Sequence, residues 1–196
     1  MTQTNRKWQP LDLAYAGMFA ALMAIGANLT AMISFGTIPL TMQTFFAIMA
    51  GALLGSRLGT ISMIVYMIVG LIGVPVFAGF SGGPGTIFHP TFGFIVSFIF
   101  VAYATGKIIE AKPNPRLPRF LVACFVGLIL NYGIGTTIMY FALNFWYGGA
   151  DGISYGLAWM GMLPFLPKDI FFTVVAAVIA PRIYRSVRKS TYQTAA

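Results

Sequence analysis

Charged side chains are scarce in this chain. Of its 196 residues only 12 are Lys or Arg and 4 are Asp or Glu, while 58% are hydrophobic and the mean hydropathy is +0.83. In a soluble globular domain roughly a quarter of the residues are charged. A disordered chain contains few apolar residues. The composition therefore excludes both classes and predicts an all-α integral membrane protein.

Cysteine and histidine are almost absent as well. The single cysteine, Cys124, excludes a disulfide framework, and the single histidine, His89, cannot build a metal site with the few scattered acids. No G-x-x-x-x-G-K-[ST] phosphate loop occurs, so we expect no ATP hydrolysis by this chain itself. No nucleophile–base set or acidic cluster is found. We therefore expect neither an enzyme nor a resident cofactor or metal.

Long uncharged stretches, interrupted by glycine and proline, predict six transmembrane helices in a single membrane domain over residues 1–196. The stretch 13–56 breaks at residues 36–39, and the stretch 58–106 breaks in the glycine-rich segment 78–85. The expected helices cover about residues 12–35, 41–55, 59–77, 91–109, 119–145 and 167–185.

The basic side chains lie almost entirely on one side of that arrangement. With the N-terminus inside, only Lys168 falls on the outer side. Because basic loops face the cytoplasm, we expect both termini in the cytoplasm of a multi-pass protein of the cell membrane. The net charge of +8 then reflects topology and predicts no nucleic-acid partner. The inner basic residues are Arg6, Lys7, Arg57, Lys107, Lys112, Arg116, Arg119, Arg182, Arg185, Arg188 and Lys189.

The connections expected on the outer side are rich in glycine, proline and aromatic residues. A glycine-rich backbone lets a small ligand approach closely, so we expect a binding site near the outer face. Asp169 is either a ligand contact or a first-turn carboxylate that the helix dipole favours, and Lys168 either helps it or extends towards water. Gln43 and Asn131 lie in apolar spans, where they either join helices or line a cavity.

Small residues form a stripe on the first expected helix. Ala16, Ala20 and Ala24 recur every four residues, with Gly17 and Ala21 alongside. Such a stripe lets another transmembrane helix approach closely. That helix belongs either to this protein or to a partner.

Several motifs in a fixed order carry a family resemblance. They are residues 38–44 (IPLTMQT), 51–59 (GALLGSRLG), 66–79 (YMIVGLIGVPVFAG), 81–83 (SGG) and 90–94 (PTFGF). Together they resemble the BioY family, the biotin-binding S components of energy-coupling factor (ECF) transporters. The resemblance implies six transmembrane helices, an outward-facing biotin pocket, and a membrane complex with a T component and two cytoplasmic ATPases that use ATP. It also implies that Ala16, Ala20 and Ala24 contact the T component.

Two positions depart from the family pattern. Family members commonly read Pro-Thr-Gly-Gly-Tyr where this chain has Pro-Thr-Phe-Gly-Phe at residues 90–94. They also carry a lysine three residues after the acid of the last helix, where this chain has Phe172. Asp169 matches that acid. Lys168 lies about one helical turn from Phe172, so it replaces the missing lysine only if its side chain turns inward.

The chemistry of biotin suits the candidate residues. Its ureido ring offers two N–H donors and a carbonyl acceptor, and its tail ends in a carboxylate. Asp169 suits a ureido N–H, and Lys168 suits either the carbonyl or the carboxylate. A few polar groups in an apolar pocket are typical of small-molecule sites. The expected biotin-binding residues are Thr41, Gln43, Tyr66, Phe77, Thr91, Asn131, Trp159, Lys168 and Asp169.

The sequence thus predicts an S component that captures biotin at the outer face for ATP-driven uptake. Two alternatives stay open within transport: an S component for another vitamin, and a biotin transporter that works alone. A membrane enzyme would need a metal or nucleophile set that the sequence lacks. A purely structural membrane subunit would bind no ligand.

Overall fold

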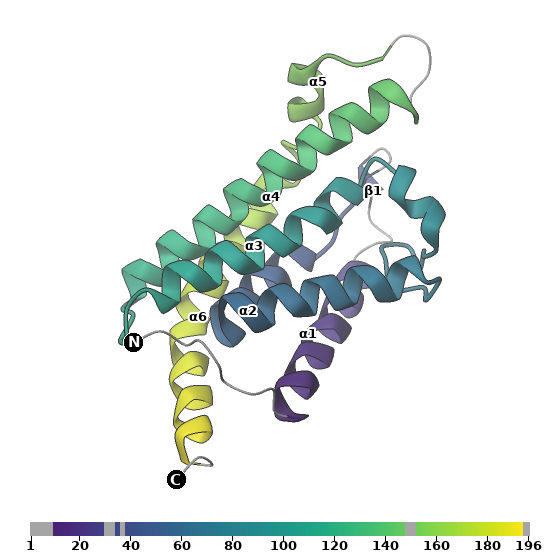
Figure 1. Ribbon diagram of the computed structural model, residues 1–196. Helices are drawn as coiled ribbons and strands as arrows, with labels where there is room; N and C mark the ends of the chain where they lie inside the picture. The colour runs from purple at the N-terminus through teal and green to yellow at the C-terminus, as the bar shows by residue number, and fades with distance from the viewer. Residues whose placement is uncertain (1–9, 30–33, 36–37, 148–151, 194–196) are drawn as a thin grey trace.

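The computed structural model describes residues 10–29, 34–35, 38–147 and 152–193. Five long helices form a bundle, and the short elements lie at one end of it (Figure 1). The strands β1 and β2 pair antiparallel, with Phe35 opposite Ile38. The elements are α1 (Pro10–Asn28), β1 (Ser34–Phe35), β2 (Ile38–Pro39), α2 (Gln43–Leu71), the 3-10 helix η1 (Pro84–Phe88), α3 (Phe92–Glu110), α4 (Leu117–Phe145), α5 (Tyr155–Met160) and α6 (Leu166–Gln193).

Helix α2 consists of two helical halves joined at Gly55. The backbone of Gly55 has φ of +84° and ψ of 177°, a conformation that side chains with a Cβ rarely adopt. Glu110, the last residue of α3, caps the second half: its Oε1 accepts from the Ser56 N–H at 3.0 Å, and its Oε2 accepts from the Ser56 hydroxyl at 2.7 Å. A carboxylate at a helix N-terminus satisfies free N–H groups and the helix dipole.

We expect Glu110→Ala to lower the free energy of unfolding by about 1 kcal/mol, since the start of the second half of α2 loses its cap. The melting temperature should fall by about 2–4 °C for a chain of this size. Cys124 is fully buried, so a thiol-reactive fluorophore reports unfolding in detergent. Lys112→Ala, in the exposed turn after α3, is the control. Equal melting of both variants would contradict the cap.

Close contact between α2 and α3 depends on two glycines. A Cβ on Gly51 would lie 2.4 Å from the backbone oxygen of Ala102, and one on Gly106 would lie 2.2 Å from the backbone nitrogen of Ser56. Because these obstacles are backbone atoms, they cannot rotate away. Glycine therefore lets the two helices pack backbone to backbone, as is common in membrane bundles.

The predicted helix bounds need correction in four places. The first helix ends at Asn28, not near residue 35, and Asn28 Nδ2 donates to Ala24 O at 3.0 Å in its last turn. The third ends at Leu71, not residue 77, because Gly73 takes φ of +109°. The last extends beyond residue 185 to Gln193. The connection predicted at residues 56–59 is helical instead, and the break within α2 is at Gly55.

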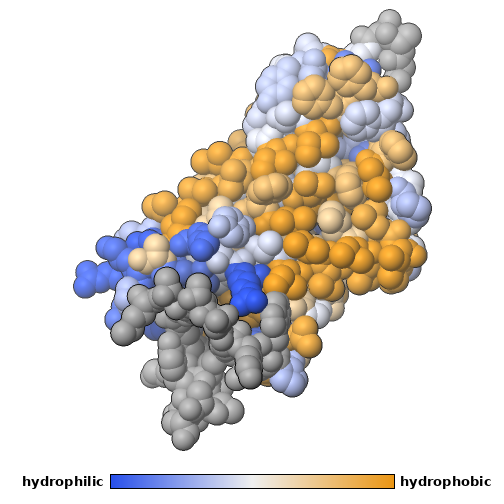
Figure 2. Space-filling model, in the orientation of Figure 1, coloured by the Kyte–Doolittle hydropathy of each residue, from blue (hydrophilic) through white to orange (hydrophobic). Residues whose placement is uncertain are grey.

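The surface of the bundle is apolar along most of its length. Figure 2 shows a wide hydrophobic band, with hydrophilic residues gathered at the end that carries the turn between α3 and α4. Large apolar side chains are exposed on the helices, such as Ile129 (68% exposed) and Leu13 (61% exposed). Helices α1, α2, α3 and α4 are each long and apolar enough to cross a membrane.

Candidate functional site

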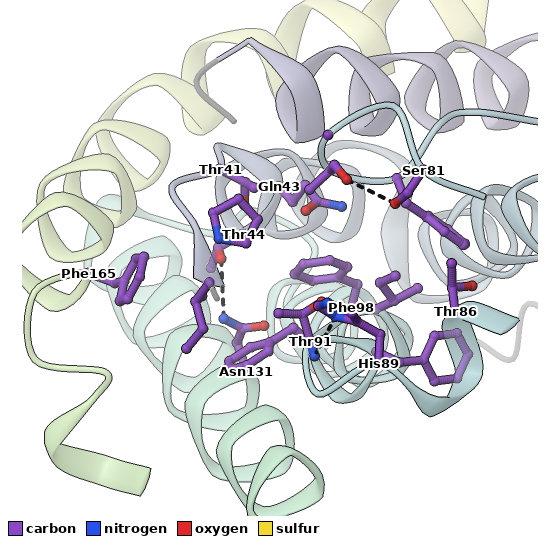
Figure 3. A pocket seen from close by; sticks show the side chains of 18 of the residues that line it. Thr41, Gln43, Thr44, Ser81, Thr86, His89, Thr91, Phe98, Asn131 and Phe165 are labelled. Carbon is purple, nitrogen blue, oxygen red and sulfur yellow. Dashed lines mark hydrogen bonds between the residues drawn. The ribbon is translucent and has the colours of Figure 1, made fainter. Parts of the chain in front are cut away.

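A cavity of about 560 Å³ opens among α2, α3, α4, the start of α6 and the segment between α2 and α3. Phenylalanines and aliphatic side chains form much of its wall, including Phe77, Phe94, Phe98 and Phe165. A limited set of polar groups points into it (Figure 3). The polar lining residues are Thr41, Gln43, Thr44, Ser81, Thr86, His89, Thr91, Asn131, Tyr132, Tyr147, Lys168 and Asp169.

An ion pair lies in the first turn of α6. The Lys168 ammonium is 2.8 Å from Asp169 Oδ1 and donates to the carbonyl oxygen of Thr41, just before α2. Asp169 is 7% exposed, and its Oδ2 accepts from the Tyr132 hydroxyl at 2.8 Å. The lysine side chain therefore turns inward, and the pair ties α6 to α2 and α4.

Phe172, where the family lysine is missing, does not line the cavity. Its ring packs edge to face against Phe45 of α2, with ring centroids 5.8 Å apart. The structure thus supplies an inward ammonium from Lys168 instead, four residues earlier on the helix.

Asn131 joins three helices at the cavity wall. Its Oδ1 accepts from the Ser97 hydroxyl of α3 at 2.7 Å, and its Nδ2 donates to the Thr44 hydroxyl of α2 at 3.2 Å. The residue is 2% exposed. Both functions that the sequence left open, joining helices and lining a cavity, apply to Asn131.

Gln43 begins α2 and holds a second polar connection. Its Nε2 donates to the Tyr66 hydroxyl at 2.8 Å, which in turn donates to the carbonyl oxygen of Val76 at 3.1 Å. The Tyr66 ring packs edge to face on Phe77, which does line the cavity. Tyr66 therefore lies behind the wall and supports Gln43 and Phe77 from there.

The segment between α2 and α3 covers one side of the cavity and is held from several directions. Gly83 N donates to Gly70 O at 2.7 Å, and Phe80 N donates to Asn28 Oδ1 at the end of α1 at 2.7 Å. His89 Nδ1 and the Thr91 hydroxyl share a hydrogen bond of 2.7 Å. Burial lowers the pKa of His89, because the surroundings disfavour the charged imidazolium.

Most of the predicted binding residues meet at this cavity. Trp159 and Tyr66 do not line it: Trp159 lies on α5, is 37% exposed and packs against Tyr155. Aromatic character alone did not show which face of its element Trp159 occupies. The predicted residues in the wall are Thr41, Gln43, Phe77, Thr91, Asn131, Lys168 and Asp169.

The sequence interpretation missed Tyr132, Thr44 and Phe165. Tyr132 follows Asn131 directly, so the neighbouring polar residue was an available signal for it. Thr44 follows Gln43 in the same way. Nothing in the sequence around Phe165 distinguishes it from the other phenylalanines of the outer segments.

The stripe on α1 divides between two faces. Ala16 is 3% exposed and packs inside this chain, while Ala20 and Ala24 are half-buried against the same core. Ala14, Gly17 and Ala21 are exposed. The structure thus gives Ala16 an internal contact and leaves a neighbouring row of small residues outside.

Comparison with known proteins decides the family. A model of the BioY family matches residues 1–189. The chain belongs to the BioY family. A relative named putative biotin transporter BioYB, from Bacillus subtilis strain 168, is 47% identical over 190 residues, which are 95% of this chain and 94% of the relative. The biotin transporter BioY of Thermotoga maritima is 34% identical over 88% of this chain and 95% of its own.

A solved structure shows the same fold as this BioY-family chain. It is a crystal structure at 2.1 Å of the S-component for biotin from an ECF-type ABC transporter, with a TM-score of 0.74 and 25% sequence identity. The match covers 89% of this chain and 91% of that one. Family membership and the four apolar helices make the chain a multi-pass protein of the cell membrane.

Proposed function

We propose that this BioY-family chain is an S component that captures biotin at the outer face of the membrane for ATP-driven uptake. The observation that supports it best is the Lys168–Asp169 pair in the wall of a mostly apolar cavity. A ureido ring has N–H donors for the carboxylate and a carbonyl for the ammonium, so one neutral group satisfies both partners.

The rest of the cavity suits the rest of the ligand. The bicyclic ring and the tail of biotin are largely apolar, and Phe77, Phe98 and Phe165 offer apolar contact. Asn131 and Gln43 add neutral polar groups. These contacts support Thr41, Gln43, Phe77, Thr91, Asn131, Lys168 and Asp169 as binding residues, with Tyr66 as a support behind the wall.

We further propose six membrane crossings in one membrane domain, with both termini in the cytoplasm. The crossings are α1, the two halves of α2, α3, α4 and α6. The turn between α3 and α4 is basic, whereas the end that carries η1 and α5 has Lys168 as its basic side chain. By the positive-inside rule the cavity then opens outward.

As an S component, the chain would act with a T component and two cytoplasmic ATPases, which use the ATP. The solved relative is described as a component of an ECF-type ABC transporter, and this supports the assembly. Under this proposal the chain itself is no enzyme and carries no cofactor of its own. A biotin transporter that works without these partners is the second candidate, since curated relatives are named biotin transporters.

Equilibrium binding of labelled biotin to the purified protein tests the proposal, and we expect saturable binding well below micromolar ligand. Unlabelled desthiobiotin should compete, while thiamine and riboflavin should not, because neither has a cyclic urea with two N–H donors. Competition by thiamine or riboflavin would favour an S component for another vitamin. The absence of binding at micromolar biotin would refute biotin capture and favour a structural subunit.

A further inference from the structure

The charged tail of biotin and its neutral ureido ring need different binding partners in the cavity. On the basis of the proposed biotin site, we propose that the Lys168–Asp169 pair recognises the ureido ring and that the tail carboxyl of biotin has no cationic partner in the protein. The protein therefore also binds biotin derivatives whose carboxyl is an amide, such as biotin amide and biotinyl-lysine.

The positive charge of Lys168 is already neutralised within the protein. Its ammonium lies 2.8 Å from Asp169 Oδ1 and also donates to the Thr41 carbonyl. A carboxylate that approached the ammonium would also approach the buried carboxylate of Asp169, and like charges repel strongly at such a site. A neutral ureido ring meets no such repulsion.

Asp169 has hydrogen-bonding capacity left for the ring. Its two oxygens accept from Lys168 and Tyr132, but an ionised carboxylate has about four acceptor positions. One ureido N–H, beside the Tyr132 hydroxyl, therefore fits a free acceptor position of the carboxylate. The ureido carbonyl can accept from the ammonium in the same arrangement.

The other side of the cavity offers neutral groups to the tail. Ser81, Thr86 and His89 line it there, across from Asn131 and Phe165 (Figure 3). Burial lowers the pKa of His89, which favours its neutral imidazole. Hydroxyl and backbone N–H donors serve an amide oxygen as well as a carboxylate oxygen.

Among the residues that the structure describes, no lysine or arginine besides Lys168 lines the cavity. The sequence holds no Lys or Arg between Arg57 and Lys107. Lys107 lies in the last turn of α3, at the opposite end from Thr91. The tail therefore gains little from its negative charge.

Competition against labelled biotin on the purified full-length protein tests the inference. We expect biotin amide and biotinyl-lysine to bind within about tenfold of biotin, a difference of about 1.4 kcal/mol or less. A biotin analogue methylated on both ureido nitrogens should bind more than about a hundredfold more weakly, because it cannot donate to Asp169. Amides weaker by more than tenfold, while biotin binds, would overturn the inference. Failure of biotin itself to bind would overturn the proposed function instead.

A variant separates the two possible roles of the lysine. We expect Lys168→Met to weaken biotin and biotin amide by the same factor, since both present the same ring. A loss confined to biotin would show that Lys168 binds the carboxylate and would overturn the inference. If Lys168→Met does not fold, as judged from the accessibility of Cys124, Lys168→Gln is used instead. It keeps a hydrogen-bond donor, and we expect it to weaken biotin and biotin amide by the same factor. Lys107→Met is the matched control and should leave both affinities unchanged.

Discussion

Replacing Asp169 with asparagine is expected to weaken biotin binding by at least about tenfold, because each 1.4 kcal/mol is a factor of ten. A hydrogen bond to a charged group contributes roughly 1.5–3 kcal/mol. The asparagine keeps the shape, and its oxygen can still accept from Lys168. Its amide, however, presents N–H donors to the N–H donors of the ureido ring. Equilibrium binding of labelled biotin to the purified variant measures the change.

A different result is expected if Asp169 has a purely structural role. As a carboxylate in the first turn of α6, it would stabilise the helix through the dipole. Asp169→Asn would then lower the melting temperature and leave the affinity for biotin nearly unchanged. An unchanged dissociation constant in a folded Asp169→Asn protein therefore removes Asp169 from the site.

Tyr132→Phe is the matched control for this test. It removes the hydroxyl that donates to Asp169 Oδ2 but keeps the carboxylate and the ring. We expect a smaller loss of affinity than for Asp169→Asn, since the carboxylate stays and retains Lys168. A larger loss for Tyr132→Phe would mean that the tyrosine, not the acid, contacts the ligand.

The helical bundle could be predicted because hydropathy is a local property. Uncharged stretches predicted α1, α2, α3 and α4, and Pro167 predicted the start of α6. The short connection after residue 55 predicted the break within α2. The helix ends could not be predicted as well. Asn28 ends α1 where its side chain reaches Phe80, which is distant in sequence, and a contact of that kind leaves no local pattern.

Cavity-lining residues could be predicted where a polar side chain is costly in an apolar span. Gln43, Asn131 and Asp169 stand out in apolar surroundings, and all three line the cavity. Tyr132 does not stand out, because tyrosine is ordinary in a membrane helix. Only its rotation on α4, which packing decides, brings its hydroxyl to Asp169.

The direction of the Lys168 side chain also depended on packing. Sequence left it open whether the lysine extends outward or turns inward. The carbonyl of Thr41 and the carboxylate of Asp169 lie together on the inner side, and they offer the ammonium two acceptors. Without the Lys168 ammonium, the buried carboxylate of Asp169 would make the folded protein far less stable.

The exposed row on α1 supports a further expected result. We expect Gly17→Trp to abolish association with the T component while biotin binding stays intact. Gly17 is exposed, and a Cβ there meets no atom of another element within 4 Å, so we expect the variant to fold. Close packing between transmembrane helices requires small residues, and an indole at the contact would hold the helices apart.

Tryptophan substitutions at Ala20 and Ala16 extend the same test to more buried positions of α1. Ala20 is half-buried against the core, so Ala20→Trp should block association at some cost in melting temperature. Ala16 is 3% exposed, so Ala16→Trp should disturb the fold and reduce biotin binding as well. Val122→Trp on the exposed face of α4 is the control for a bulky side chain on the membrane surface.

Co-purification with the T component and the ATPases, alongside biotin binding by each variant, distinguishes the two roles of the stripe. Loss of association for Gly17→Trp, with Val122→Trp unaffected, places the partner on the outer row formed by Ala14, Gly17 and Ala21. Full association of Gly17→Trp would mean that the small residues of α1 serve internal packing, as Ala16 does. The partner surface would then lie on another helix, because an indole in the centre of a close helix contact cannot be accommodated.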